Sequence, residues 1–128
     1  MRGTAFFQAN APAAEARVTE KLPEIVTLAA EASSGAPYDN RQIARVNDHV
    51  VRISVMTQPY RWHAHPNCDE VFLVIEGSLE IEFEEGALRL GPGQMITVPR
   101  GRRHRTRPVG DRSVNITFEA AGAESIFE

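Results

Sequence analysis

The chain has 128 residues, a single cysteine, 42% hydrophobic residues and a formal net charge of -3. A chain of this length can bury one hydrophobic core but hardly two, so a single domain is predicted. The slightly acidic balance gives no general attraction to nucleic acid, and the absence of a long apolar run gives no reason to expect a membrane partner. With no apolar leader and no possible internal disulfide, a cytoplasmic location is the expectation.

The N-terminal part of the chain differs in pattern from the rest. Residues 1 to about 18 are rich in alanine and show no clear period, which indicates an arm. Between Leu22 and Ser34 the apolar residues recur at helical spacing, and Gly35 suits the end of a helix. We therefore predict that residues 1–36 form an arm followed by one helix packed outside the main domain.

From Ile43 onward the pattern changes to short strands. The clearest segment runs from Leu79 to Glu84, where three apolar residues alternate strictly with three glutamates, so one face is predicted to meet the core and the other to be solvated. Further strands are predicted near residues 51–55, 62–65, 71–75, 87–90, 94–98 and 114–118. About seven or eight short strands separated by glycine and proline predict an all-β sandwich or barrel over residues 37–128.

The histidines of this region form a pattern typical of a metal site. His63 and His65 are two residues apart, so on a strand both rings project from the same face. The acidic pair Asp69 and Glu70 follows directly, and His104 adds a third imidazole. Imidazole and carboxylate together suit one divalent transition metal such as iron, manganese, nickel, cobalt or zinc, and suit calcium or magnesium poorly.

These residues resemble the two motifs of the cupin superfamily, which consists of small jelly-roll β-barrels. The first motif is matched at His63, His65, Glu70 and Gly77. The second motif is matched at Gly93, Pro99, Gly101 and His104. Thr57 and Pro108 stand where the motifs usually have glycine and asparagine, but both are positions of backbone geometry, so the predicted ligands are unaffected.

The resemblance implies an all-β fold, a cupin-type jelly-roll β-barrel with one N-terminal helix packed outside. It also implies that Glu70, rather than Asp69, is the carboxylate ligand, because Glu70 keeps the motif's spacing to Gly77. The predicted metal ligands are then His63, His65, Glu70 and His104. Similar bacterial cupins are often labelled by analogy to mannose-6-phosphate isomerase, but without a phosphate site we do not transfer that activity to this chain.

Two classes of function remain open. Four ligands leave up to two positions of an octahedral ion for substrate, which predicts a metal-dependent dioxygenase, isomerase or lyase acting on a small chelating or anionic molecule. The alternative is a non-enzymatic cupin that binds or senses a small molecule. Tyr60 and Arg61 are the candidate catalytic residues; strand parity would place Arg61 on the same side as His63, although each also has an ordinary interpretation as a packing or solvated residue.

The dense arginines of residues 100–107 have no interleaved aromatic residues, so a nucleic-acid partner is not expected. Arg103, Arg105 and Arg107 share one strand face and are expected to balance the glutamates of residues 80–84, in the same or a neighbouring subunit. A homodimer is predicted because a jelly roll leaves edge strands and an apolar outer face. Trp62 and the N-terminal arm are the expected contacts.

Overall fold

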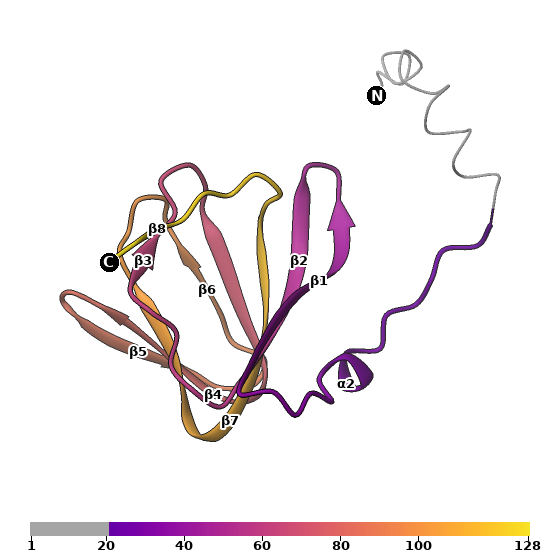
Figure 1. Cartoon of the computed structure of the whole chain (residues 1–128), viewed down its shortest axis with the longest axis horizontal. Helices are drawn as coiled ribbons and strands as arrows, with labels where there is room; N and C mark the ends of the chain where they lie inside the picture. Colours follow the sequence, from indigo (N-terminus) through magenta and orange to yellow (C-terminus); the bar gives the residue numbers. More distant parts are fainter. Residues whose placement is uncertain (1–20) are drawn as a thin grey trace, which may run out of the picture.

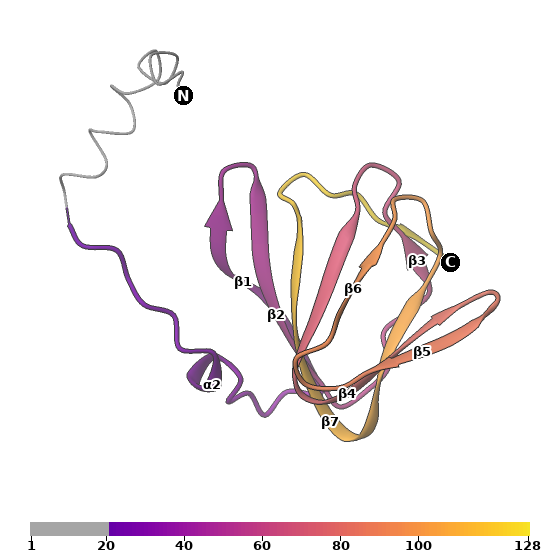
Figure 2. The same cartoon turned by 180° about the vertical axis from the view of Figure 1, so that it is seen from behind.

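The computed structural model describes residues 21–128, and its strands form an antiparallel barrel. The elements are α2 (Leu28–Glu31), β1 (Tyr38–Val46), β2 (His49–Met56), β3 (His63–Ala64), β4 (Glu70–Phe83), β5 (Gly86–Leu90), β6 (Met95–Val98), β7 (Arg105–Ala120) and β8 (Ile126–Phe127). The larger sheet has the order β1-β2-β7-β4-β5, with β6 also paired to β4, and β3 pairs with β8. Figures 1 and 2 show α2 outside the barrel, on the side of β1 and β2. The predicted all-β barrel with one external N-terminal helix is confirmed.

The two longest strands, β4 and β7, pair with each other along most of their length. The strands predicted near residues 71–75 and 79–83 are one continuous strand, β4, whose register against β7 shifts on both sides of Glu76. Gly77 follows this residue with a φ of 73°, a backbone conformation that favours glycine. A Cβ atom at Gly77 would overlap the backbone carbonyl oxygen of Arg112 in the partner strand. The glycine therefore lets β4 bend while it stays paired with β7.

The barrel buries two apolar clusters on opposite faces of the sheet. The cluster inside the barrel consists of Met56, Phe72, Val74, Leu79, Ile81, Leu90 and Val98. The second cluster joins β2 and β7 to Ala32, which directly follows α2, and its other members are Ile53, Val55, Val114 and Ile116. Because α2 lies outside the barrel, this second cluster is on the outer face. Other residues of β2 and β7 face inward instead, and among them Ser54, Asn115 and Thr117 make part of the wall polar.

The predicted helix over residues 22–34 is much shorter in the structure. Only Leu28–Glu31 are helical, while Leu22 and Ile25 are 86% and 93% exposed. A short helix is marginal in water unless its apolar face packs on a neighbour, and within residues 21–128 the side chains of Leu22 and Ile25 remain largely exposed. Ala32, which is 4% exposed, is the residue of this segment that reaches the outer cluster. The helical spacing was therefore a correct sign of a helix but a wrong guide to its length.

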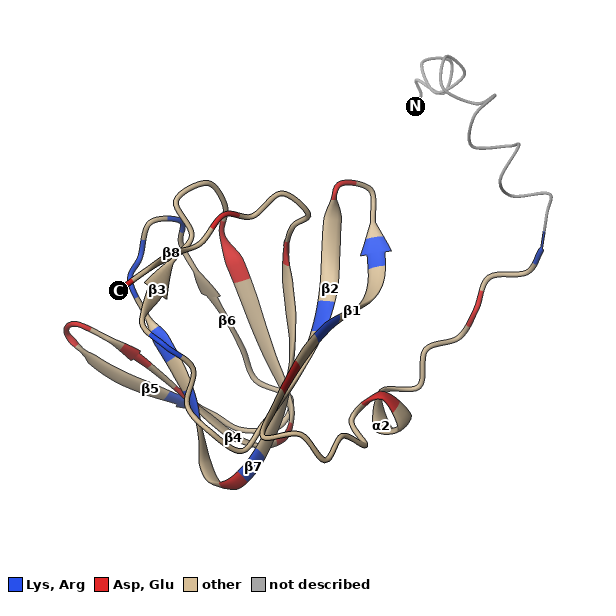
Figure 3. Cartoon of the chain, in the orientation of Figure 1, with Lys and Arg blue, Asp and Glu red and all other residues tan. Residues whose placement is uncertain are grey.

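The arginine-rich segment forms a ladder of ion pairs with the glutamates of β4 and of the turn that follows it; two pairs join β4 to β7, and the third lies just beyond both strands. The pairs are Arg103–Glu84 at 3.6 Å, Arg105–Glu82 at 2.9 Å and Arg107–Glu80 at 2.7 Å. Figure 3 shows basic segments of β7 beside acidic segments of the β4–β5 hairpin. Cross-strand pairs of opposite charge stabilise a sheet by about 0.2–1 kcal/mol each. The expectation that these arginines balance the glutamates is confirmed, and the pairs form within one chain.

Glu80 makes part of this stability dependent on pH. Hydrogen bonds from Arg107 and Arg89 lower the pKa of Glu80 from its ordinary 4.5, so its ionised form stabilises the fold above that pH. This contribution is lost as the pH falls below about 4.5 and through the lower pKa of the folded state. We expect Glu80→Gln to flatten the acid-side decline of the free energy of unfolding, measured by urea denaturation between about pH 5 and about pH 3. Glu84→Gln, at a far more exposed position, is the control; equal slopes for wild type and Glu80→Gln would contradict the assignment.

Three further expectations concern the surroundings of the barrel. The arm of residues 1 to about 18 lies outside the described residues. The ring centroid of Trp62 lies 4.2 Å and 5.2 Å from the guanidinium carbons of Arg103 and Arg105, so the chain's own arginines pack against this candidate dimer contact. The homodimer stays a prediction that sedimentation velocity would check.

Among residues 21–128, the structure contains no helix with the length and apolarity needed to cross a membrane. The cytoplasmic location stays an expectation.

Candidate metal centre

Backbone pairing brings the two predicted motifs together. The amide of His63 donates to the carbonyl of His104 at 2.9 Å, and the amide of His104 donates to the carbonyl of His63 at 2.8 Å. The turn before His104 includes Gly101, which has a φ of 77° and whose amide donates to the carbonyl of His65 at 2.7 Å. Residues more than 35 positions apart therefore become neighbours through main-chain hydrogen bonds. Gly101 of the second motif thus makes the turn that aligns His104 with His63.

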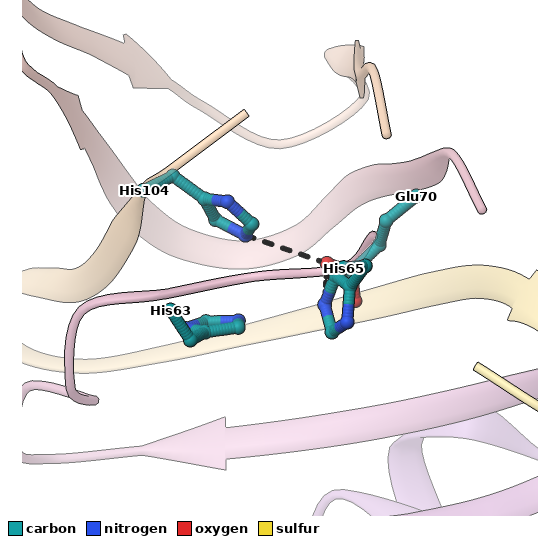
Figure 4. Close-up of side chains that lie close together, drawn as sticks. All are labelled: His63, His65, Glu70 and His104. Carbon is teal, nitrogen blue, oxygen red and sulfur yellow. Dashed lines mark hydrogen bonds and ion pairs between the residues drawn. The ribbon is translucent and has the colours of Figure 1, made fainter. Parts of the chain in front are cut away.

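The four predicted ligand side chains converge on one point inside the barrel (Figure 4). One potential ligand atom from each of His63, His65, Glu70 and His104 lies within 4.8 Å of the others. All four residues are buried, from 0% exposure for His104 to 7% for His65 and Glu70. The structure thus brings together all the residues that the sequence predicted as ligands, and it places them where bulk water is largely excluded.

Hydrogen bonds at the rear of each imidazole fix its orientation. In His63, His65 and His104 the Nδ1 atom lies next to a backbone carbonyl oxygen. The acceptors are the carbonyls of Arg61 at 2.8 Å, Glu124 at 2.9 Å and Arg102 at 2.8 Å. A carbonyl only accepts, so each Nδ1 carries the hydrogen and the Nε2 atom is the one directed to the centre. Such backing hydrogen bonds are typical of histidines that bind metals through Nε2.

His104 Nε2 provides the strongest test of whether an ion fits. This atom is fully buried, has no hydrogen-bond partner within residues 21–128, and lies 3.5 Å from Oε1 of Glu70. A buried polar atom left unpaired costs about 1–3 kcal/mol. Coordination of a divalent ion would give this lone pair a partner, and three imidazole nitrogens with one carboxylate are a donor set for first-row transition metals. The residues present therefore fit the predicted ion.

The charges of the cluster are coupled. Burial lowers the pKa of His63, which keeps this ring neutral. Burial also raises the pKa of Glu70, but contacts with His104 and His65 outweigh it and hold that pKa below its ordinary range. The hydrogen bond between His65 Nε2 and Glu70 Oε1, at 3.0 Å, raises the pKa of His65 to about 9. Without metal, His65 is therefore an imidazolium that forms an ion pair with Glu70.

Metal binding should release the proton of His65. Because the pKa of His65 is raised to about 9, the ring is charged at pH 7 and must lose this proton before Nε2 can bind metal. We expect release of about one proton per Mn²⁺ at pH 7 and an affinity that rises about tenfold per pH unit between about pH 6 and about pH 8. Isothermal titration calorimetry in two buffers of different ionisation enthalpy measures the released proton. A binding enthalpy that does not depend on the buffer would contradict this prediction.

A cavity of about 300 Å³ extends into the barrel from three of the four side chains, those of His63, His65 and Glu70. Tyr60 lines it, with its ring stacked on Tyr38 at a centroid distance of 5.1 Å and edge-on to His63 at 5.2 Å. Arg61 is not among the described residues that line this cavity; its guanidinium lies 4.2 Å from the ring centroid of Phe127. Residues 59–62 are not in a strand, so the strand parity used to place Arg61 on the cavity side does not apply.

Sequence reasoning missed a second carboxylate in the cavity, that of Glu119 on β7. Burial and the neighbouring Glu70 raise the pKa of Glu119 to about 7. Asn115 and Thr117 precede it on the same face of β7 and also line the cavity. The printed sequence shows their alternation with apolar residues, but alternation alone does not reveal which face of a strand points inward.

Three other residues with potential ligand atoms, Asp69, His49 and Cys68, are not part of the four-residue cluster. Asp69 accepts a hydrogen bond from the amide of Arg100 at 2.9 Å, so it stabilises the turn before His104. His49 is exposed and pairs with Asp48 at 2.9 Å. Cys68 is partly buried and is not part of the four-residue cluster. Main-chain carbonyls, and not Asp69, therefore lie behind the imidazoles.

Sequence comparison gives one family and two relatives. The profile of the family described as "Cupin domain" matches residues 50–118. The uncharacterized protein YdbB of Bacillus subtilis is 37% identical over 107 residues, which cover 83% of this chain and 92% of YdbB. The polyketide synthase CurC of Streptomyces cyaneus is 36% identical over 56 residues, which cover 44% of this chain and 36% of CurC. The similarity to YdbB spans most of both chains, whereas that to CurC covers less than half of either.

Structure comparison gives the same fold. A cupin-2 domain protein of Shewanella frigidimarina is 27% identical, with a TM-score of 0.71 over 75% of this chain and 94% of that protein. A candidate mannose-6-phosphate isomerase of Ralstonia eutropha is 23% identical, with a TM-score of 0.65 over 77% of this chain and 98% of that protein. The second similarity shows the fold alone. The matched profile, the extent of the similarity to YdbB and the jelly-roll barrel together show that this chain belongs to the cupin family.

Proposed function

We propose that this cupin is a metal-dependent enzyme that holds one divalent first-row transition metal per subunit and acts on a small chelating molecule inside the barrel. The observation that carries the proposal is the convergence of four buried ligand atoms within 4.8 Å, where His63, His65 and Glu70 also line a cavity of about 300 Å³. A cavity of this size suits a small ligand and is at the lower end of the usual range for binding pockets.

The protein residues have distinct parts in this proposal. His63, His65, Glu70 and His104 would hold the ion, and the carbonyls behind the imidazoles would keep the Nε2 atoms aligned. The bound ion would supply either Lewis-acid polarisation of a carbonyl or redox chemistry with dioxygen. Tyr60, whose ring meets that of His63 edge-on, remains the candidate for a proton-transfer residue at the cavity wall.

The reaction class divides into two alternatives. With iron, the site suits a dioxygenase; with any divalent ion it suits an isomerase or lyase, because both chemistries need a chelated substrate in a dry pocket. A cupin that binds or senses a small molecule without changing it is the second candidate function, since the same ligand set and cavity would serve recognition. Catalytic turnover separates the enzyme from the binder.

The test is turnover by the metal-loaded protein beside the same protein stripped with a chelator. Candidate hydroxy acids and hydroxy ketones are incubated in excess, substrate loss is followed by proton NMR, and oxygen consumption is followed with an electrode. The proposal predicts many turnovers per subunit only with metal, and a Tyr60→Phe variant that keeps its metal but turns over more slowly. Saturable binding with no product from any of these compounds would favour the binder, and equal turnover without metal would overturn the proposal.

A further inference from the structure

One wall of the cavity is polar where a barrel interior is usually apolar. Ser54 on β2 and Asn115 and Thr117 on β7 line the cavity, and all three are at least 96% buried. The residues next to them along these strands, such as Val55 and Ile116, belong to the outer apolar cluster. The strands thus direct their polar side chains inward, toward the same space that the metal ligands face.

This wall has unused hydrogen-bonding groups. Both amide atoms of Asn115, which is 1% exposed, have no hydrogen-bond partner in the described part of the chain. The hydroxyl of Thr117, which is 2% exposed, also has none among those residues. An unpaired buried polar group destabilises a fold, and an apolar residue of the same shape would avoid that cost. A ligand in the cavity would supply hydrogen-bond partners to the Asn115 amide and the Thr117 hydroxyl, and this explains why polar residues are present there.

The charges around the cavity indicate that this part of the ligand is neutral. Glu70 and Glu119 both line the cavity, and Arg52 is the one arginine or lysine among the described lining residues. Arg52 lies 4.0 Å from the carboxylate of Glu119 and donates a hydrogen bond to Asn40 at 3.3 Å. With Glu70 bound to the metal, a phosphate or second carboxylate on this part of the ligand would meet Glu119 and one arginine that already has partners. Hydroxyl groups, which both donate and accept, match an amide and a threonine hydroxyl.

We propose that Asn115 and Thr117 are substrate-binding residues that recognise hydroxyl groups on an uncharged, polyhydroxylated tail, while the chelating head of the same molecule binds the metal. The proposal rests on the proposed function, because it needs a metal at His63, His65, Glu70 and His104 to hold the head. It assigns the substrate class as a small polyhydroxylated acid or ketone rather than a phosphate ester.

The test compares two kinds of acid with the same chelating head and the same number of carbons. Threonate and erythronate carry two tail hydroxyls, whereas 2-hydroxybutyrate carries none. In the Mn²⁺-loaded protein we expect threonate or erythronate to bind at least about tenfold more tightly than 2-hydroxybutyrate, measured by calorimetry. Asn115→Leu is expected to abolish this preference without changing the metal content. Equal affinities in the wild type, no binding of any of the acids, or a preference that persists in Asn115→Leu would each overturn the proposal.

A second variant separates recognition from a structural role. Thr117→Val keeps the shape of the side chain and removes the hydroxyl, so a hydroxyl that awaits a ligand can be removed without loss of thermal stability. We expect an unchanged or higher Tm together with weaker threonate or erythronate binding. A Tm several degrees lower would show that the hydroxyl has a partner within the protein and would overturn its assignment. If the wild type binds none of Mn²⁺, Fe²⁺, Co²⁺, Ni²⁺ and Zn²⁺, the proposed function itself fails; if it binds Mn²⁺ without preferring the hydroxylated acids, only this inference fails.

Discussion

His104→Ala is expected to weaken the binding of a divalent transition metal by at least about 100-fold while the barrel stays folded. Removal of residues that only support metal ligands already costs about 10- to 100-fold, so the loss of a direct ligand should cost at least as much. His104 is suited to this test because its Nε2 atom is buried and has no protein hydrogen-bond partner within residues 21–128. Its removal therefore breaks no side-chain hydrogen bond made by that atom.

The measurement is the dissociation constant for Mn²⁺, with circular dichroism to check the fold of each variant. His63→Ala is the second variant, because the larger exposure of His63, 6% against 0%, makes truncation there less disruptive. His49→Ala is the matched control, since His49 is a surface histidine that pairs with Asp48 and should leave the affinity unchanged. Folded His63→Ala and His104→Ala proteins with wild-type affinity would show that these residues do not bind the metal.

Gly77→Ala adds only one methyl group but should lower the free energy of unfolding by about 3 kcal/mol or more. Two effects add up. The φ of 73° is unfavourable for any residue with a side chain, and the new Cβ would overlap the carbonyl oxygen of Arg112 across the pair of long strands. Relief of that overlap requires β4 and β7 to separate where their register shifts.

Urea denaturation of Gly77→Ala and Gly101→Ala separates these two effects. Gly101 has a similar φ of 77°, but a Cβ there meets nothing within 4 Å, so this variant reports the conformational cost alone, about 1–2 kcal/mol. The difference between the variants then gives the cost of the overlap. If Gly77→Ala lost no more stability than Gly101→Ala, the close approach of β4 to Arg112 would be contradicted.

The strands and the ligand cluster could be predicted because their signals are local. Strict alternation at residues 79–84 specifies a strand wherever it occurs, and His63 and His65 fall on one face of any strand. His104 was placed by the fixed spacing of two motifs, which the structure explains: the turn at Gly101 and mutual main-chain hydrogen bonds set it beside His63. Residues with such constraints can be assigned before the fold is known.

The remaining features depend on contacts between distant parts of the chain. The helix predicted at residues 22–34 is short because apolar residues such as Ile25 stay exposed in the described part of the chain, which no periodicity reveals. Alternation near Asn115 was visible, but both faces of β7 are buried, one in the outer cluster and one at the cavity, so the polar face was not recognised as internal. Arg61 was misplaced because strand parity was extended to residues outside a strand.

The most direct test of the metal centre is elemental analysis of the protein purified without an affinity tag, with metal quantified per subunit. We expect close to one iron, manganese, cobalt, nickel or zinc ion per subunit, and near-complete loss of that metal in the His63→Ala protein. Protein that contains none of these metals, and that takes up none when they are supplied at neutral pH, would contradict the assignment of His63, His65, Glu70 and His104 as ligands.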